Sequence, residues 1–280
     1  MKTAFVKMHG AGNDFAVFDE RRVRLGLTPA LAAALADRHH GIGCDQLISI
    51  ERSARADAFM RIRNADGSEA EACGNATRCV AALLAADGDG RRFVVETVSG
   101  LLPAELEDGG RVQVDMGPPA TAWHEIPLAR PLETLALPPA PGWPGEPAAV
   151  SMGNPHLTFF VPDADQADVA GLGPKIERDP LFPERINVGF ASLLAPGRLR
   201  LRVWERGAGL TRACGSGASA AVVNASRRNL IGREATVVMD GGILDIAWRA
   251  GVGDEAGHVL MTGPTAIAFR GEVELDAYPR

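Results

Sequence analysis

The sequence predicts an α+β fold made of two domains of like topology, and three observations support this prediction. Short apolar runs typical of strands outnumber helical patterns along the chain. A dense group of prolines lies near the middle of the sequence and interrupts both kinds of element. A set of polar residues recurs at a constant offset of 141 positions. At 280 residues, the chain is long enough for each half to bury its own core.

Short segments rich in apolar and β-branched residues predict strands along the whole chain. In order, they are Thr3–Val6, Phe15–Phe18, Leu47–Ile50, Phe93–Glu96, Val112–Met116, Leu157–Val161, Leu199–Trp204, Ala235–Met239, Ile243–Trp248 and Val259–Thr262. Helical patterns occupy Pro29–His39, Gly74–Ala86 and Gly215–Asn229. The first helix has a clear start, because Thr28 is a good N-cap and Pro29 suits the first helical position.

Nine of the chain's 19 prolines lie between Gly117 and Pro147. Proline at this density is incompatible with helix interiors and central strands, so the segment is predicted to connect two domains. Its many alanines and leucines indicate that it packs against a domain rather than forming a loose tether.

The repeat at offset 141 is the most informative feature of the sequence. The run Ala72-Cys73-Gly74-Asn75-Ala76 recurs as Ala213-Cys214-Gly215-Ser216-Gly217. The same offset pairs Gly12-Asn13 with Gly153-Asn154, Gln46 with Asn187, and Asn64 with Glu205. A duplicated unit with a pseudo-twofold axis explains the set, and equivalent residues facing one another near such an axis would line a ligand pocket. Taken singly, Asn13 or Asn154 could equally be turn residues.

The two repeated cysteines, Cys73 and Cys214, each precede a small-residue helical stretch and are predicted to stand at helix N-termini. Unpaired N–H groups and the positive end of the dipole favour a thiolate or a bound carboxylate there. Inversion of an amino-acid α-carbon requires one proton-transfer group on each face, and a symmetric pair of thiols would supply both. A redox disulfide between them is a weaker alternative. Cys44 and Cys79 are expected to be small core residues.

Other classes of protein are poorly supported. The formal charge is −6 with scattered basic residues, which argues against nucleic acid or an anionic membrane as partner. No signal peptide or membrane span is evident, so we expect a cytoplasmic protein with free thiols. Dinucleotide, P-loop and nucleophile-elbow motifs are missing, no cysteine pair has zinc-ligand spacing, and no lysine suggests a Schiff base. We therefore expect neither cofactor nor metal.

Ordered motifs along the chain resemble the diaminopimelate epimerase family, from near residue 3 to about residue 270. They are Lys7–Phe15, Gly41–Gln46, Arg63–Ser68, Ala72–Arg78, Gly153–His156, Arg185–Val188, Trp204–Gly209, Thr211–Ala218 and Thr262–Pro264. Single motifs are not specific, but together they are.

The resemblance implies a role for each site residue. Cys73 and Cys214 would be the acid/base thiols. The backbone amides of Gly74-Asn75 and Gly215-Ser216 would bind the reacting carboxylate. Glu205 would take the reacting ammonium, with Asn13 and His156 shaping the pocket. The distal end of the substrate would be held by Asn64, Asn154, Asn187 and Arg206, with Gln46 nearby. Without the resemblance, Arg206 could be a surface ion-pair partner and His156 a core histidine.

The resemblance also implies two domains, each a curved, mainly antiparallel sheet around a central helix that begins at its cysteine. They would span residues 1–116 with about 264–280, and residues 117–263, with the site in a cleft that closes on substrate. The reaction would convert LL-2,6-diaminopimelate to the meso form for lysine and peptidoglycan synthesis, without a cofactor. A homodimer is expected, although Phe269 stands where relatives can carry a dimer-contact tyrosine. The tail 271–280 is expected to be an extension without catalytic content.

Two rival functions differ in testable features. A two-thiol racemase of proline, hydroxyproline or histidine would not need the distal contacts of Asn64, Asn187 and Arg206. A silent amino-acid-binding protein would keep its ligand affinity after replacement of either cysteine.

Overall fold

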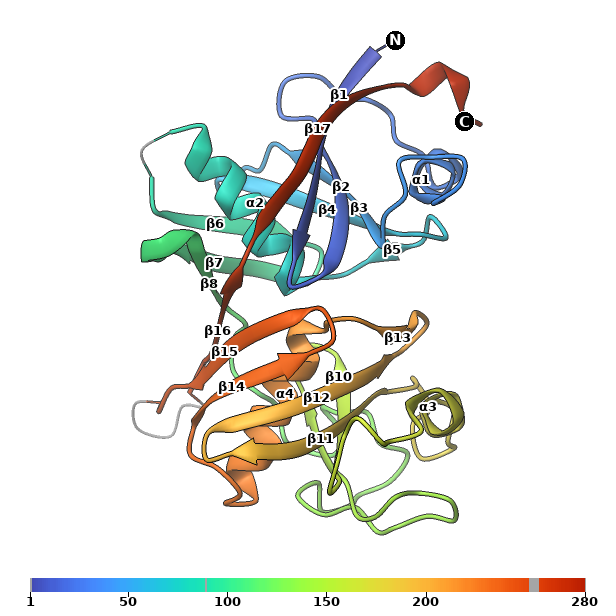
Figure 1. Ribbon diagram of the computed structural model, residues 1–280, viewed down its shortest axis with the longest axis vertical. Helices are drawn as coiled ribbons and strands as arrows, with labels where there is room; N and C mark the ends of the chain where they lie inside the picture. Colours follow the sequence, from blue (N-terminus) through green and yellow to red (C-terminus); the bar gives the residue numbers. More distant parts are fainter. Residues whose placement is uncertain (1, 89, 252–256, 280) are drawn as a thin grey trace. The chain divides into compact units, whose positions relative to one another are not determined.

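The computed structural model describes residues 2–88, 90–251 and 257–279 (Figure 1). The chain forms two compact units. Unit 1 comprises Met1–Val114 with Gly263–Arg280, and unit 2 comprises Asp115–Thr262.

Unit 1 is a mixed sheet with two helices. Its strands are β1 (Lys2–Gly10), β2 (Asn13–Asp19), β3 (Gln46–Glu51), β4 (Ala58–Asn64), β5 (Glu69–Ala70), β6 (Arg92–Thr97), β7 (Gly100–Leu106), β8 (Arg111–Asp115) and β17 (Ala266–Glu274). Its helices are α1 (Pro29–Ala36) and α2 (Gly74–Ala86), with the 3₁₀ turns η1 (Asp108–Gly110) and η2 (Leu275–Ala277). The strand order is β17-β1-β2-β3-β4-β6-β7-β8, and β5 pairs with β4.

Unit 2 is built in the same way. Its strands are β9 (Ala148–Ser151), β10 (Pro155–Phe160), β11 (Asn187–Ala195), β12 (Arg198–Glu205), β13 (Gly209–Thr211), β14 (Glu234–Met239), β15 (Gly242–Trp248) and β16 (Val259–Pro264). Its helices are α3 (Val169–Glu177) and α4 (Gly215–Arg227). The strand order is β9-β10-β11-β12-β14-β15-β16, and β13 pairs with β12.

The two sheets share one topology, which confirms the predicted duplication. In unit 1 the β2–β3 and β4–β6 pairs are parallel, and the other pairs are antiparallel. In unit 2 the parallel pairs are β10–β11 and β12–β14, at the equivalent positions. The offset of 141 also relates the starts of β3 and β11, the ends of β4 and β12, and the starts of α2 and α4. Both units are therefore mainly antiparallel α+β folds.

In unit 1, alternate side chains of the sheet enter two different cores because successive strand residues point to opposite faces. On β2, Phe15 and Val17 pack in the core that contains Val80 of α2. Ala16 and Phe18 pack instead in the core that contains Leu35 of α1. The two helices thus bury opposite faces of the sheet, and α2 contacts β1, β6 and β7 (Figure 1).

Unit 2 follows the same plan. Leu157 and Phe159 of β10 pack in the core that contains Ile176 of α3. Thr158 points to the other face, where its hydroxyl accepts a hydrogen bond of 3.1 Å from Asn224 of α4. Each cysteine-bearing helix therefore packs against one face of its sheet, and its small side chains allow this close approach.

The sequence prediction missed α3, because Gly171, Gly173 and Pro174 disguise its helical pattern. Asp168 starts this helix by accepting a hydrogen bond of 2.9 Å from the Gly171 amide. Gly173 is required by packing, since a Cβ atom there would lie 2.4 Å from Cγ of Trp204. Tertiary contacts override the poor helix propensity of this segment.

Two further expectations need correction. The helix predicted to extend to His39 ends at Ala36, because the Asp37 carboxylate accepts hydrogen bonds from the amides of His39 and His40. The tail is not a simple extension either, because residues 271–274 complete β17 and pair with residues 2–5 of β1.

The proline-rich segment belongs to unit 2 and packs on it, as its alanine and leucine content predicted. Ile126, Leu128 and Leu137 lie in the unit 2 core. The prolines prevent helices and strands in this segment, but the segment still contributes side chains to the unit 2 core.

Gly67 provides a test of the turn that follows β4. Its φ is +84°, and a Cβ atom would lie 2.2 Å from the Pro29 carbonyl oxygen at the start of α1. Gly109, in the same unit, has a φ of +80° and no atom within 4 Å of an added Cβ. We expect G109A to lower the melting temperature by about 2–4 °C, for a backbone penalty of about 1 kcal/mol. G67A should lower it at least twice as far, and equal effects in calorimetry would contradict the steric argument.

Candidate active site

Both predicted cysteines cap helices through their side chains. The Cys73 sulfur accepts the Ala76 amide at 3.5 Å at the start of α2. The Cys214 sulfur accepts the Gly217 amide at 3.4 Å at the start of α4. Each sulfur thus lies at the positive end of a helix dipole, where negative charge is favoured.

In unit 1, Asn13 lies at the centre of the polar cluster around Cys73. Its Oδ1 lies 3.7 Å from the Cys73 sulfur and accepts a hydrogen bond of 3.3 Å from Nδ2 of Asn75. Its own Nδ2 donates to Asp45 at 3.0 Å. The Asn13 amide is held from both ends, so its carbonyl oxygen is directed at the thiol.

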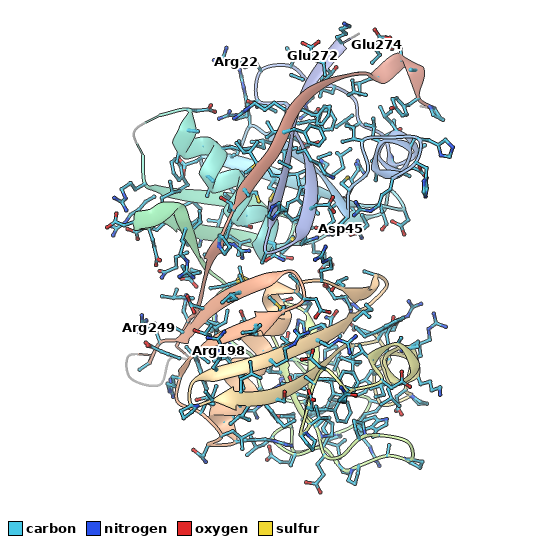
Figure 2. The ribbon with its side chains drawn as sticks, in the orientation of Figure 1. Arg22, Asp45, Arg198, Arg249, Glu272 and Glu274 are labelled. Atoms are coloured by element: carbon cyan, nitrogen blue, oxygen red, sulfur yellow. The ribbon has the colours of Figure 1, made fainter. Side chains whose placement is uncertain are left out.

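Charged side chains form a hydrogen-bonded network around Asp45, the partner of Asn13. Asp14 accepts hydrogen bonds from Lys7 at 2.6 Å and from Arg38 at 2.7 Å, and Arg38 also bonds Asp45. Although partial burial opposes ionisation, these hydrogen bonds hold the pKa of Asp14 well below its ordinary value. Asp45 lies at the opposite end of unit 1 from Glu272 and Glu274 (Figure 2). Asp45 lies within the motif Gly41–Gln46, but no role in the site was predicted for it from the sequence.

Gln46 and Asn64 form a second polar pair in unit 1. They are direct partners in the β3–β4 ladder, and Nε2 of Gln46 donates to Oδ1 of Asn64 at 3.0 Å. Asn64 Nδ2 donates in turn to the Ser68 hydroxyl at 3.1 Å. Gln46 also aligns with Phe15 at the start of the parallel β2–β3 pair, so the pair lies at the same end of the sheet as Asn13.

In unit 2, His156 connects Asn154 to the cysteine. Its Nε2 lies 3.0 Å from Oδ1 of Asn154 and 3.0 Å from the Ser216 hydroxyl, which lies 3.6 Å from the Cys214 sulfur. The Asn154 carbonyl oxygen can only accept, so Nε2 carries the proton. Burial, with the nearby Arg206 guanidinium, lowers the pKa of His156 to about 3. The imidazole is therefore neutral near pH 7.

Cys214 is held in its thiol form. Burial and the Glu205 carboxylate raise the pKa of this thiol well above its ordinary value. Glu205 ends β12, and its Oε1 also accepts a hydrogen bond from the Thr211 hydroxyl. An anionic partner and a nearly dry environment both disfavour the thiolate.

The turn that carries Glu205 and Arg206 is anchored from two sides. Oδ1 of Asn187 accepts the Arg206 amide at 2.9 Å, while Nδ2 of Asn187 donates to the Pro155 carbonyl. The buried Glu177 carboxylate accepts hydrogen bonds from the Trp204 indole at 2.7 Å and from the Gly207 amide at 3.2 Å. Glu177 was missed in the sequence because the helix that carries it was missed. The Arg206 guanidinium donates to the Glu184 carbonyl at 3.0 Å.

The remaining two cysteines are free and buried. Burial raises the pKa of Cys44 to about 11 and that of Cys79 to about 12. Both therefore remain thiols, in keeping with the expected packing role. In the described part of the chain, no helix has the length and apolarity to cross a membrane. Across the same residues, no group of three or more His, Cys, Asp or Glu side chains could hold a metal ion.

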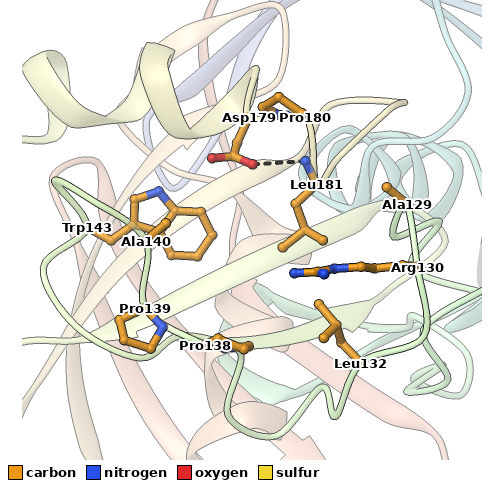
Figure 3. A pocket seen from close by; sticks show the side chains of 10 residues that line it. All are labelled: Ala129, Arg130, Leu132, Pro138, Pro139, Ala140, Trp143, Asp179, Pro180 and Leu181. Atoms are coloured by element: carbon orange, nitrogen blue, oxygen red, sulfur yellow. Dashed lines mark hydrogen bonds between the residues drawn. The ribbon is translucent and has the colours of Figure 1, made fainter.

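A cavity of about 340 Å³ lies elsewhere in unit 2, between the proline-rich segment and the loop after α3 (Figure 3). Arg130 lies between Leu132 and Leu181 along one side, with Trp143 across from it. It contains none of the residues predicted for the site.

Comparison with solved structures identifies the fold. Hydroxyproline epimerase from Agrobacterium vitis superimposes with a TM-score of 0.72 at 18% sequence identity, over 98% of this chain and 93% of that one. Together with the sequence relatives described next, the duplicated fold with a cysteine at the start of each central helix defines an isomerase of the racemase and epimerase class.

Sequence comparison specifies the family within this class. The diaminopimelate epimerase profile matches residues 5–122 and 148–267. Diaminopimelate epimerase from Acidiphilium cryptum is 59% identical over 270 residues, covering 96% of each chain. The enzyme of that name from Rhodospirillum centenum is 55% identical over 282 residues, covering 100% of this chain and 95% of that one. The chain belongs to the diaminopimelate epimerase family.

The buried neutral His156 predicts a pH dependence of stability. Its pKa is about 3 in the folded protein against 6.5 for the free side chain, so the unfolded chain binds the proton first as pH falls. The stability that the neutral imidazole contributes is complete above about pH 6.5 and is lost progressively below it.

Phe15 stands at the equivalent position of unit 1, so H156F is a tolerable replacement. Between pH 7 and pH 5, we expect the melting temperature of H156F to fall by less than that of wild type. H124F, at an exposed histidine, is the control, and an unchanged pH profile in H156F would refute the assignment.

Proposed function

We propose that the protein converts LL-2,6-diaminopimelate to meso-2,6-diaminopimelate by proton transfer at one α-carbon, with Cys73 and Cys214 as the acid/base pair. The reaction would serve lysine and peptidoglycan precursor synthesis. The observation that carries the proposal is the pair of thiols at equivalent helix starts in a duplicated chain of this family.

The chemistry requires a base on one face of the α-carbon and an acid on the other. In the LL-to-meso direction, the Cys73 thiolate removes the α-proton and the Cys214 thiol donates a proton to the opposite face. After turnover, Cys73 is the thiol and Cys214 the thiolate, and proton exchange restores the starting state. The raised pKa of Cys214 supports its role as the proton donor.

The developing negative charge on the substrate carboxylate also needs stabilisation. We assign this role to the first-turn amides of the two helices, Gly74-Asn75 and Gly215-Ser216. Helix N-termini bind anions through their free N–H groups and the positive end of the helix dipole. They therefore favour the negatively charged intermediate over the neutral carbon acid. The mechanism as proposed uses no cofactor and no metal.

The other site residues are assigned to substrate recognition. Glu205 would bind the reacting ammonium, and Asn13 and His156 would shape the pocket at the reacting carbon. The anchoring of the Glu205-Arg206 turn by Asn187 supports its role in binding, because a fixed turn loses little entropy when substrate arrives. The distal amino-acid end would be held by Asn64, Asn154, Asn187 and Arg206, with Gln46 adjacent.

We further propose that residues 1–116 with about 264–280 form the epimerase half that carries Cys73, and residues 117–263 the half that carries Cys214. The compact units support this division. The proposed substrate is a small polar metabolite, and we place the enzyme in the cytoplasm.

The decisive experiment is turnover of LL-diaminopimelate in heavy water with purified, reduced protein and no added cofactor. Deuterium should enter at one α-carbon as the meso product forms. C73S and C214S should each lower kcat by about 10²–10⁴-fold, because a hydroxyl is a far weaker base than a thiolate and a far weaker acid than a thiol. The buried C44A variant, outside the acid/base pair, should keep the wild-type rate.

Other results would contradict the proposal. Wild-type protein that neither exchanges nor isomerises diaminopimelate would overturn the substrate assignment. Exchange into proline or hydroxyproline alone would favour the rival racemase. Unchanged ligand affinity in both serine variants, with no turnover in wild type, would indicate a binding protein.

We also propose that the enzyme is a homodimer associating through β17. Ile267 and Phe269 on this strand are 46% and 50% exposed, although Phe269 packs edge-on against Phe5. Exposed apolar side chains on a strand are a usual self-association surface.

F269E should therefore shift the protein to monomers in sedimentation velocity. V23E, at an apolar residue that is 61% exposed outside this strand, is the matched control and should leave the sedimentation coefficient unchanged. A monomeric wild type, or a dimer that survives F269E, would refute the proposed surface.

A further inference from the structure

Arg78 is a completely buried arginine one turn beyond Cys73 on α2. Its exposed fraction is 0%. Its guanidinium donates a hydrogen bond of 2.9 Å to Oδ1 of Asn75. Burying a guanidinium is expensive unless its hydrogen bonds are well made. The Arg78 guanidinium is buried despite this cost, and it bonds a residue of the proposed site. Both facts point to a functional role.

The hydrogen bond from Arg78 determines the orientation of the Asn75 amide. Because a guanidinium can only donate, the atom of Asn75 that faces it must be the carbonyl oxygen. Nδ2 of Asn75 is then directed to Oδ1 of Asn13, at 3.3 Å. That same Asn13 oxygen accepts a hydrogen bond of 3.7 Å from the Cys73 thiol. A continuous chain of contacts therefore runs from Arg78 to the thiol through two amide side chains.

The second half of the protein supports its cysteine differently. The position equivalent to Arg78 is Ser219, which is also fully buried and donates to the Gly215 carbonyl at 3.1 Å. The position equivalent to Asn75 is Ser216, which contacts neutral His156. Unit 1 thus places a cation near its thiol, whereas unit 2 places the Glu205 carboxylate near the other thiol.

The charge of Arg78 persists at working pH. Burial lowers the pKa of Arg78 only to about 10, and interaction with the thiols of Cys79 and Cys73 opposes that fall while Arg111 adds to it. By reciprocity, cationic Arg78 favours the thiolate at Cys73. Asp45, which bonds Asn13, is the carboxylate that faces the chain of contacts from its other end.

We propose that Arg78 is a positioning residue of the Cys73 half: through Asn75 it fixes the Asn13 carbonyl oxygen that accepts the Cys73 thiol proton, and its buried positive charge favours the thiolate that forms when this proton leaves. The catalytic part rests on the proposed function, whereas the effect on thiol reactivity does not. The asymmetry between Arg78 and Ser219 would give the resting enzyme one base and one acid.

The first test measures alkylation by iodoacetamide at each cysteine against pH, using peptide mass spectrometry on the intact folded protein. R78M should raise the pH of half-maximal alkylation at Cys73 by about one unit, because the loss of a buried charge outweighs the loosening of the long contact between the thiol and Asn13. Cys214 should be unchanged. R78K should keep the charge and stay near wild type. R227M is the matched control, because half-buried Arg227 on α4 bonds the Ala149 carbonyl and Thr134 instead of site residues.

The second test measures turnover. R78K should lower kcat by roughly 10- to 100-fold with little change in KM, because a lysine cannot reproduce the planar fork that orients Asn75. R227K should lower the melting temperature without this loss of kcat. R78K is decisive if R78M does not fold.

The outcomes separate the two proposals. An unshifted Cys73 profile in R78M, or full kcat in R78K, would overturn the role of Arg78 and leave the epimerase assignment intact. A shifted profile in a protein whose wild type shows no turnover would retain the role of Arg78 in thiol reactivity and reject the epimerase assignment.

Discussion

The structure depends on one arrangement, a cysteine sulfur that accepts the third amide of the helix it caps. Cys73 and Cys214 make this contact at the starts of α2 and α4. The sulfur lies close to the first turn of the helix, and a Cβ atom added at Gly217 would stand only 3.2 Å from the Cys214 sulfur. The sheet packed against each helix holds that contact, which is buried at Cys214 and half-buried at Cys73.

The duplicated chain holds two copies of this arrangement, and their electrostatic surroundings are unequal. Unit 1 surrounds Cys73 with amides linked to Arg78, whereas unit 2 surrounds Cys214 with a neutral imidazole and a carboxylate. A symmetric pair would give both thiols the same proton affinity. Under the proposed mechanism, two unequal environments would separate the acid from the base before a substrate arrives.

The sequence predicted those features of the fold and site that depend on local spacing. The offset of 141 located both cysteine helices, and the start of α2 at Gly74 was predicted to the residue. Packing between residues far apart in the sequence could not be predicted from local spacing. Helix α3 and its anchoring Glu177 depend on a glycine beneath Trp204, and Asp45 joins the site only because parallel strands bring it beside Asn13. The roles of Asp45 and Glu177 required tertiary geometry.

The return of the last strand to the first has a consequence for synthesis on the ribosome. Unit 2 is continuous from Asp115 to Thr262, so its sheet can close while translation continues. Unit 1 lacks β17 until residues 266–274 emerge, and β1 lacks its neighbour for as long. The half of the protein made first is thus the half completed last, and the nascent chain must keep an open sheet edge from aggregating until β17 has been made.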